Sequence, residues 1–92
     1  MNNKSSTISK AFKTFMTESP EHAKAWGQMI QEIGNANRLD RKTSELGYLA
    51  VLAALNRTSG IPFHVISAKE AGATRDEIIS AVLLGLRPLD MW

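Results

Sequence analysis

Glu45 and His64 are the two residues of this sequence best suited to acid–base chemistry. A carboxylate that holds one imidazole nitrogen fixes the tautomer of the ring and leaves the other nitrogen free to move a proton. Glu45 lies early in a predicted helix and His64 follows Pro62 in the first turn of another, although spacing alone does not show that the side chains meet. These two residues are the first candidates for a catalytic site.

Both residues also have a purely structural explanation. Glu45 could form an ion pair on the helix surface with Arg41 or Lys42, and His64 could be a partly buried histidine packed beside Phe63. A single glutamate and a single histidine are common in helical domains, so this alternative stays open beside the catalytic one.

Composition and charge exclude several classes of protein. The chain has 92 residues, of which 43% are hydrophobic and 22% charged, and this is typical of one soluble domain over 1–92, with 1–5 expected to be disordered. The net charge of +2 is spread along the chain, so we predict no nucleic-acid partner. The longest apolar run, Leu46 to Leu55, is shorter than the roughly 18 residues that span a bilayer, so we expect a cytoplasmic protein.

The absence of cysteine removes a further set of chemistries. Without a thiol the chain has no thiolate nucleophile, no Cys-based redox pair and no thiolate zinc site. The two histidines, His22 and His64, are far apart in the sequence. We therefore predict neither a metal site nor a bound cofactor.

Apolar periodicity and capping residues predict an all-α fold. Asp40 is a candidate N-cap, Thr74 to Glu77 form a capping box, and Gly34 and Gly72 are expected to end helices. No segment alternates as a strand does. The pattern predicts five helices, at roughly 6–17, 20–34, 40–56, 60–72 and 74–86.

The third predicted helix should be the most buried. Its segment from Leu46 to Leu55 is apolar nearly all round, which places it in the middle of the molecule or partly in a subunit interface. The first two helices carry their own apolar stripes, of which the second is expected to be buried: Ile8, Ala11, Phe12, Phe15 and Met16 in the first, and Trp26, Met29, Ile30 and Ile33 in the second.

Three segments of the sequence resemble the carboxymuconolactone decarboxylase/AhpD-like family. They are LDRKTSEL at 39–46, IPFHV at 61–65 and AGATRDEI at 71–78. Their order and their spacing to Glu45 and His64 carry the resemblance, since the last segment alone is little more than a helix stop followed by a capping box. The resemblance implies an all-helical AhpD-like bundle that assembles into trimers or hexamers of small subunits.

The resemblance implies no redox activity for this chain. In the redox branch of the family a Cys-x-x-Cys pair precedes the histidine, and the matching positions here are Arg57 and Gly60. The glutamate and histidine that assist those thiols match Glu45 and His64. Because the thiolate is the attacking species, we expect neither peroxidase nor disulfide-reductase activity.

Arg57 is a third candidate site residue. The decarboxylase branch of the family tends to place an arginine at this position, where a guanidinium could hold a substrate carboxylate while His64 transfers a proton. Glu45, however, is a feature of the redox branch. The structural alternative is that Arg57 is a solvated turn residue or one that pairs with the C-terminal carbonyls of the preceding helix.

Two functions therefore remain. We favour slightly a non-redox family member that serves as an oligomeric binding or scaffold protein; the alternative is a small acid–base enzyme of decarboxylase or lactone-processing type. A homo-oligomer is predicted in either case, because one short chain cannot bury all of its apolar faces, including the end around Trp92. The family resemblance implies a trimer or hexamer, and a dimer stays open. The enzyme would bind a small carboxylated molecule.

Overall fold

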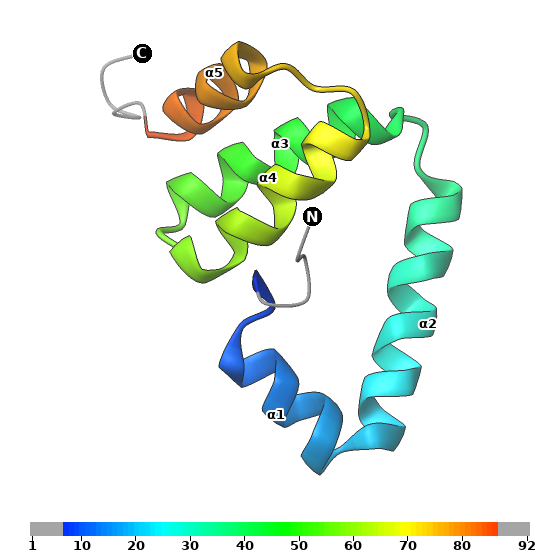
Figure 1. Ribbon diagram of the computed structural model, residues 1–92. Helices are drawn as coiled ribbons and strands as arrows, with labels where there is room; N and C mark the ends of the chain where they lie inside the picture. The colour runs from blue at the N-terminus through cyan, green and yellow to red at the C-terminus, as the bar shows by residue number, and fades with distance from the viewer. Residues whose placement is uncertain (1–6, 87–92) are drawn as a thin grey trace.

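Residues 7–86 fold as five α-helices, with a short 3-10 helix between the third and the fourth (Figure 1). The computed structural model describes residues 7–86, within which there is no strand. The helices are α1 (Lys10–Glu18), α2 (Pro20–Ala36), α3 (Arg41–Ala54), η2 (Thr58–Gly60), α4 (Ile61–Glu70) and α5 (Arg75–Gly85). The predicted all-α fold and its five helices are confirmed. The expected disorder of 1–5 and the role of the end around Trp92 concern residues outside the described range.

The predicted caps at Asp40, Thr74 and Gly72 are confirmed. The Asp40 carboxylate accepts a hydrogen bond from the Thr43 backbone N–H at 2.7 Å, and Thr74 and Glu77 form the reciprocal capping box. Gly72, with φ of 98°, supplies the left-handed turn that follows α4.

Most helix boundaries differ from the prediction by one or two residues, and two of the differences have a clear physical reason. The first helix begins at Lys10 rather than near residue 6, because the Ser9 side chain caps it by accepting from the Phe12 N–H. Gly34 does not end α2, which continues to Ala36 and stops before the extended residue Asn37. A glycine ends a helix when it takes the left-handed conformation, and Gly34 does not adopt it.

Helices α3, α4 and α5 form the bundle that contains the core. Leu49, Ala68, Ala73 and Ile78 are its buried centre. With Leu49, Leu52 and Ala53 buried, α3 has more buried residues than any other described helix, as predicted. It is not covered all round, however, since Tyr48 is 47% and Val51 48% exposed in the single chain.

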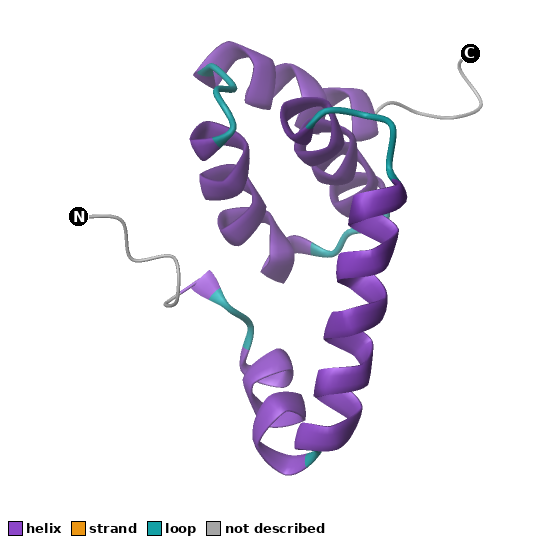
Figure 2. Cartoon of the chain, turned by 90° about the vertical axis from the view of Figure 1, so that its right-hand side faces the viewer, coloured by secondary structure: helices purple, strands orange, loops and turns teal. Residues whose placement is uncertain are grey.

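Helices α1 and α2 form a hairpin that projects from this bundle (Figures 1 and 2). Edge-to-face contacts of Trp26 with Phe12 and Phe15 hold the hairpin together, with ring centroids 5.3 and 6.3 Å apart. The apolar stripe of α2 was expected to be buried, and this is wrong for the single chain: Ile33 is 59% exposed. The reason is that α2 packs on α1 and not along the bundle.

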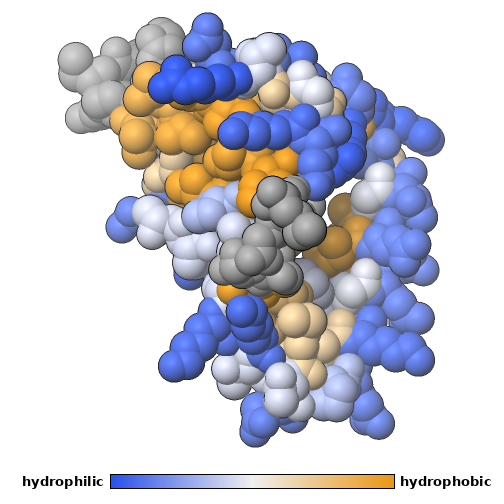
Figure 3. Space-filling view, in the orientation of Figure 1, coloured by the Kyte–Doolittle hydropathy of each residue, from blue (hydrophilic) through white to orange (hydrophobic). Residues whose placement is uncertain are grey.

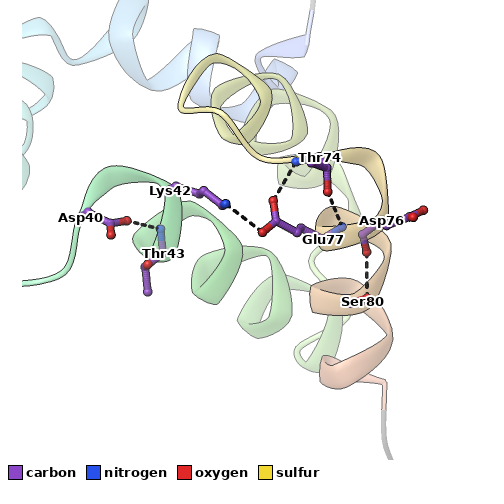
Figure 4. Close-up of polar contacts among 7 residues, drawn as sticks. All are labelled: Asp40, Lys42, Thr43, Thr74, Asp76, Glu77 and Ser80. Atoms are coloured by element: carbon purple, nitrogen blue, oxygen red, sulfur yellow. Dashed lines mark hydrogen bonds and ion pairs between the residues drawn. The ribbon is translucent and has the colours of Figure 1, made fainter.

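Ion pairs tie the start of α3 to α4 and α5. Lys42 Nζ lies 2.8 Å from Glu77 Oε2 (Figure 4), and Arg41 reaches Glu70 at 3.3 Å. The hydrogen bond from Lys42, together with the Thr74 N–H, lowers the pKa of Glu77 below its ordinary value of 4.5. The Thr43 N–H lowers the pKa of Asp40 in the same way. No helix within residues 7–86 is long and apolar enough to cross a membrane.

We expect the fold to lose stability in acid through these two carboxylates. Each has a lower pKa in the folded than in the unfolded chain, so its contribution is full above about pH 4.5 and is lost as the pH falls through the folded pKa. Thermal unfolding followed by circular dichroism from about pH 7 to about pH 3 should show a smaller acid-induced fall in Tm for Glu77→Gln than for the unmodified chain. Asp76→Asn, which leaves the Lys42 pair intact, is the control and should keep the full fall. An unchanged pH profile in Glu77→Gln would contradict the prediction.

Candidate functional site

Glu45 and His64 meet in one subunit. Glu45 on α3 places Oε2 2.9 Å from Nδ1 of His64, which lies in the first turn of α4. The two side chains are 20% and 25% exposed, so water weakens their hydrogen bond less than it weakens one on the surface. The contact joins residues 19 positions apart in the sequence.

Two aromatic rings hold the imidazole in place. The Tyr48 ring centroid lies 4.5 Å from that of His64 with the ring planes at 69°, and the Phe63 centroid lies at 5.2 Å and 70°. These are edge-to-face contacts, which favour one ring orientation. With Nδ1 directed at the carboxylate, Nε2 is the nitrogen left to exchange a proton with a ligand.

The surface ion pair that could have explained Glu45 is absent. Arg41 contacts Glu70 and Lys42 contacts Glu77, so both cations proposed as its partners lie against other carboxylates. That alternative is wrong, whereas the expected packing of His64 beside Phe63 is confirmed.

A pocket of about 480 Å³ lies beside His64, between the hairpin and the bundle. The bundle contributes Tyr48, Ser59, Gly60, Phe63 and His64, and the N-terminal part of the chain contributes Thr7, Ile8, Ser9, Phe12, Trp26 and Ile30. This volume is within the range of small-molecule sites, about 300–1,000 Å³. The imidazole therefore borders a space that a ligand can enter.

Arg57 is not among the residues that line this pocket. It is exposed between α3 and η2, and its backbone N–H donates to the Leu52 carbonyl at 2.8 Å. Its assignment as an anion holder stays a prediction. Among residues 7–86, no three histidine or carboxylate side chains gather where they could hold a metal ion.

Of the residues that line the pocket, sequence reasoning named only His64 as a site residue; Phe12, Trp26 and Tyr48 are among those that it missed. Tyr48 could have been found, because it follows Glu45 by three positions and so shares its helix face. Phe12 and Trp26 were assigned to the stripes of α1 and α2, and no local signal shows that these stripes face His64.

A comparison with protein families agrees with this arrangement. The model of the carboxymuconolactone decarboxylase family matches residues 20–87, which include α2 to α5 and both members of the Glu45–His64 pair. No curated protein and no solved structure matches the chain significantly. Since the match covers well over half of the 92 residues, the chain belongs to the carboxymuconolactone decarboxylase family.

Proposed function

We propose that the protein is a non-redox acid–base enzyme in which His64 carries the proton and Glu45 positions His64. The observation that carries this proposal is the 2.9 Å contact between Glu45 Oε2 and His64 Nδ1 beside an open pocket. A filled and dry core around His64 would have favoured a purely structural histidine. The pocket shifts the balance from the scaffold function, which the sequence favoured slightly, to the enzyme.

The dyad would act in two steps. In the neutral state Nδ1–H donates to the Glu45 carboxylate, and the lone pair on Nε2 accepts a proton from the substrate or from an attacking water. The carboxylate then stabilises the imidazolium, which returns the proton to the product or leaving group. Glu45 is a positioning residue in this scheme, because it acts through His64 and not on the substrate.

We also propose that the enzyme is a homo-oligomer. Thirteen large hydrophobic residues of the described part of the chain are exposed in one subunit. Such surface is unusual on a soluble monomer. The trimer or hexamer implied by the family resemblance would cover it, and a binding role for the assembly is compatible with catalysis in each subunit.

A neutral ester, 4-nitrophenyl acetate, tests the acid–base proposal. Its hydrolysis releases 4-nitrophenolate when a base removes a proton from the attacking water, so the rate reports on the access and basicity of Nε2. We expect His64→Gln to lower the protein-dependent rate of hydrolysis at least about tenfold, because a general base usually contributes that much or more. His64→Gln retains a donor for Glu45 and is preferred to His64→Ala for that reason.

The matched control is His22→Ala, at the other histidine of the chain. His22 is exposed on α2, where its Nδ1 lies 2.6 Å from Ser19 Oγ. The substitution His22→Ala should therefore leave the rate of hydrolysis unchanged. Glu45→Ala should lower the rate less than His64→Gln does, and ring nitrogen shifts should show that His64 no longer favours the Nδ1–H tautomer. A His64→Gln protein as active as the parent would refute the proposal.

A further inference from the structure

The part of the His64 pocket wall formed by residues 7–86 is largely apolar and holds no charged residue. Its large residues are Ile8, Phe12, Trp26, Ile30, Tyr48 and Phe63, and its other members are glycine, three hydroxyl residues and His64 itself. No lysine, arginine, aspartate or glutamate of the described residues lines it. A ligand in this pocket would meet mainly rings and methyl groups, with the hydroxyl-bearing residues Thr7, Ser9, Ser59 and Tyr48 and one imidazole as the polar part of the wall.

The Glu45–His64 dyad cannot supply the missing positive charge. When His64 is neutral, the dyad carries the negative charge of the Glu45 carboxylate. When His64 is protonated, the carboxylate 2.9 Å away balances it. A ligand carboxylate would therefore lose its hydration in the pocket without pairing with an uncompensated positive charge. Burying an unpaired charge is strongly unfavourable.

The rings of the wall favour a flat ligand. Phe12 and Trp26 meet edge to face at 5.3 Å on the hairpin side, and Tyr48 and Phe63 flank His64 on the bundle side. Aromatic faces and edges pack best against another ring. The single polar end of such a ligand would lie at His64, where Nε2 can share or move a proton.

We propose that this pocket takes an uncharged, largely apolar, flat molecule with one polar group directed at His64, and that it excludes carboxylates. The proposal rests on the acid–base function above and narrows its substrate class. It departs from the small carboxylated molecule expected from the sequence, because that expectation relied on Arg57, which lies outside the pocket wall.

Acetophenone and benzoate form a suitable pair of probes, since they have nearly the same shape and differ by one charge. Each is titrated at about pH 7 into the ¹⁵N-labelled full chain, with the Trp26 indole N–H and the Gly60 amide as reporters, both at residues of the pocket wall. We expect saturable shifts with acetophenone and a Kd at least about tenfold lower than that for benzoate.

A cation placed in the wall should reverse this preference. Ile30→Lys adds a positive charge at the pocket and should tighten benzoate binding at least about tenfold, whereas Gln31→Lys, at the next residue of α2 and outside the pocket wall, should not. The proposal is overturned if benzoate binds the parent chain as tightly as acetophenone does, or if neither probe shifts the reporters.

The two proposals fail separately. If ester hydrolysis depends on His64 but benzoate binds as well as acetophenone, the acid–base function stands and the uncharged substrate class is wrong. If acetophenone is selected but His64→Gln leaves hydrolysis unchanged, the pocket chemistry stands and the acid–base function is wrong.

Discussion

Gly85→Ala is expected to abolish the native fold or to destabilise it by at least about 3 kcal/mol, the upper range for overpacking. A Cβ at this position would lie 2.1 Å from the Ala50 carbonyl oxygen and 2.8 Å from its carbon. Both obstacles are backbone atoms of α3, so no side-chain rotation can relieve the clash. α5 would have to move away from α3, which would open the core around Leu49 and Ile78.

Gly47→Ala is the matched control for this substitution. Gly47 is also helical, but a Cβ there would meet nothing within 4 Å. We expect this variant to be more stable by about 0.5–1 kcal/mol, because alanine loses less backbone entropy on folding than glycine. Urea unfolding followed by circular dichroism compares the two variants. A Gly85→Ala protein with the stability of the parent would show that α3 and α5 do not pack as closely as the structure has them.

The helices were predictable because their signals are local. A cap such as Asp40 or Thr74 makes its hydrogen bond three residues ahead, to Thr43 or Glu77, and needs no other part of the chain. The end of α2 was not predictable in this way. Gly34 ends a helix only if its backbone turns left-handed, and nothing in the neighbouring residues decides that.

The candidate site was only partly predictable. The residue types at Glu45 and His64 indicate acid–base chemistry, but the packing of α4 on α3 determines whether they meet. The sequence also could not show that Arg41 and Lys42 do not pair with Glu45, because their actual partners are carboxylates on α4 and α5. The pocket wall depends on how the α1–α2 hairpin is placed relative to the bundle, which no periodicity within a helix can specify.

Two apolar surfaces of the subunit support the proposed assembly. Apolar atoms gather over α5, and a smaller apolar area is set back beside α2 (Figure 3). On α5 the exposed residues are Ile79, Leu83, Leu84 and, just beyond its end, Leu86; on α2 they are Trp26, Met29, Ile30 and Ile33. The α2 residues recur at three- and four-residue spacing, so they form one continuous stripe along the hairpin. Trp26 and Ile30 line the His64 pocket, so Met29 and Ile33, one helical turn apart, are the members of the stripe left as a contact surface for another helix.

We expect the chain to be a closed oligomer, and Ile33→Asp to convert it to a folded monomer near 10.1 kDa. Ile33 is 59% exposed in one subunit, so an aspartate is tolerated there in the free chain but would be buried without a partner in an interface. Gln31→Asp, on the opposite face of α2, adds the same charge and should leave the assembly intact. Light scattering with size-exclusion chromatography at micromolar concentration gives the masses, and circular dichroism checks that both variants are folded. A parent chain that is itself a folded monomer would contradict the prediction, because the exposed stripe on α2 would then need no partner. An Ile33→Asp protein that keeps the mass of the parent oligomer would show that the interface does not include Ile33. The exposed apolar surface of α5 would then be the remaining candidate for the interface.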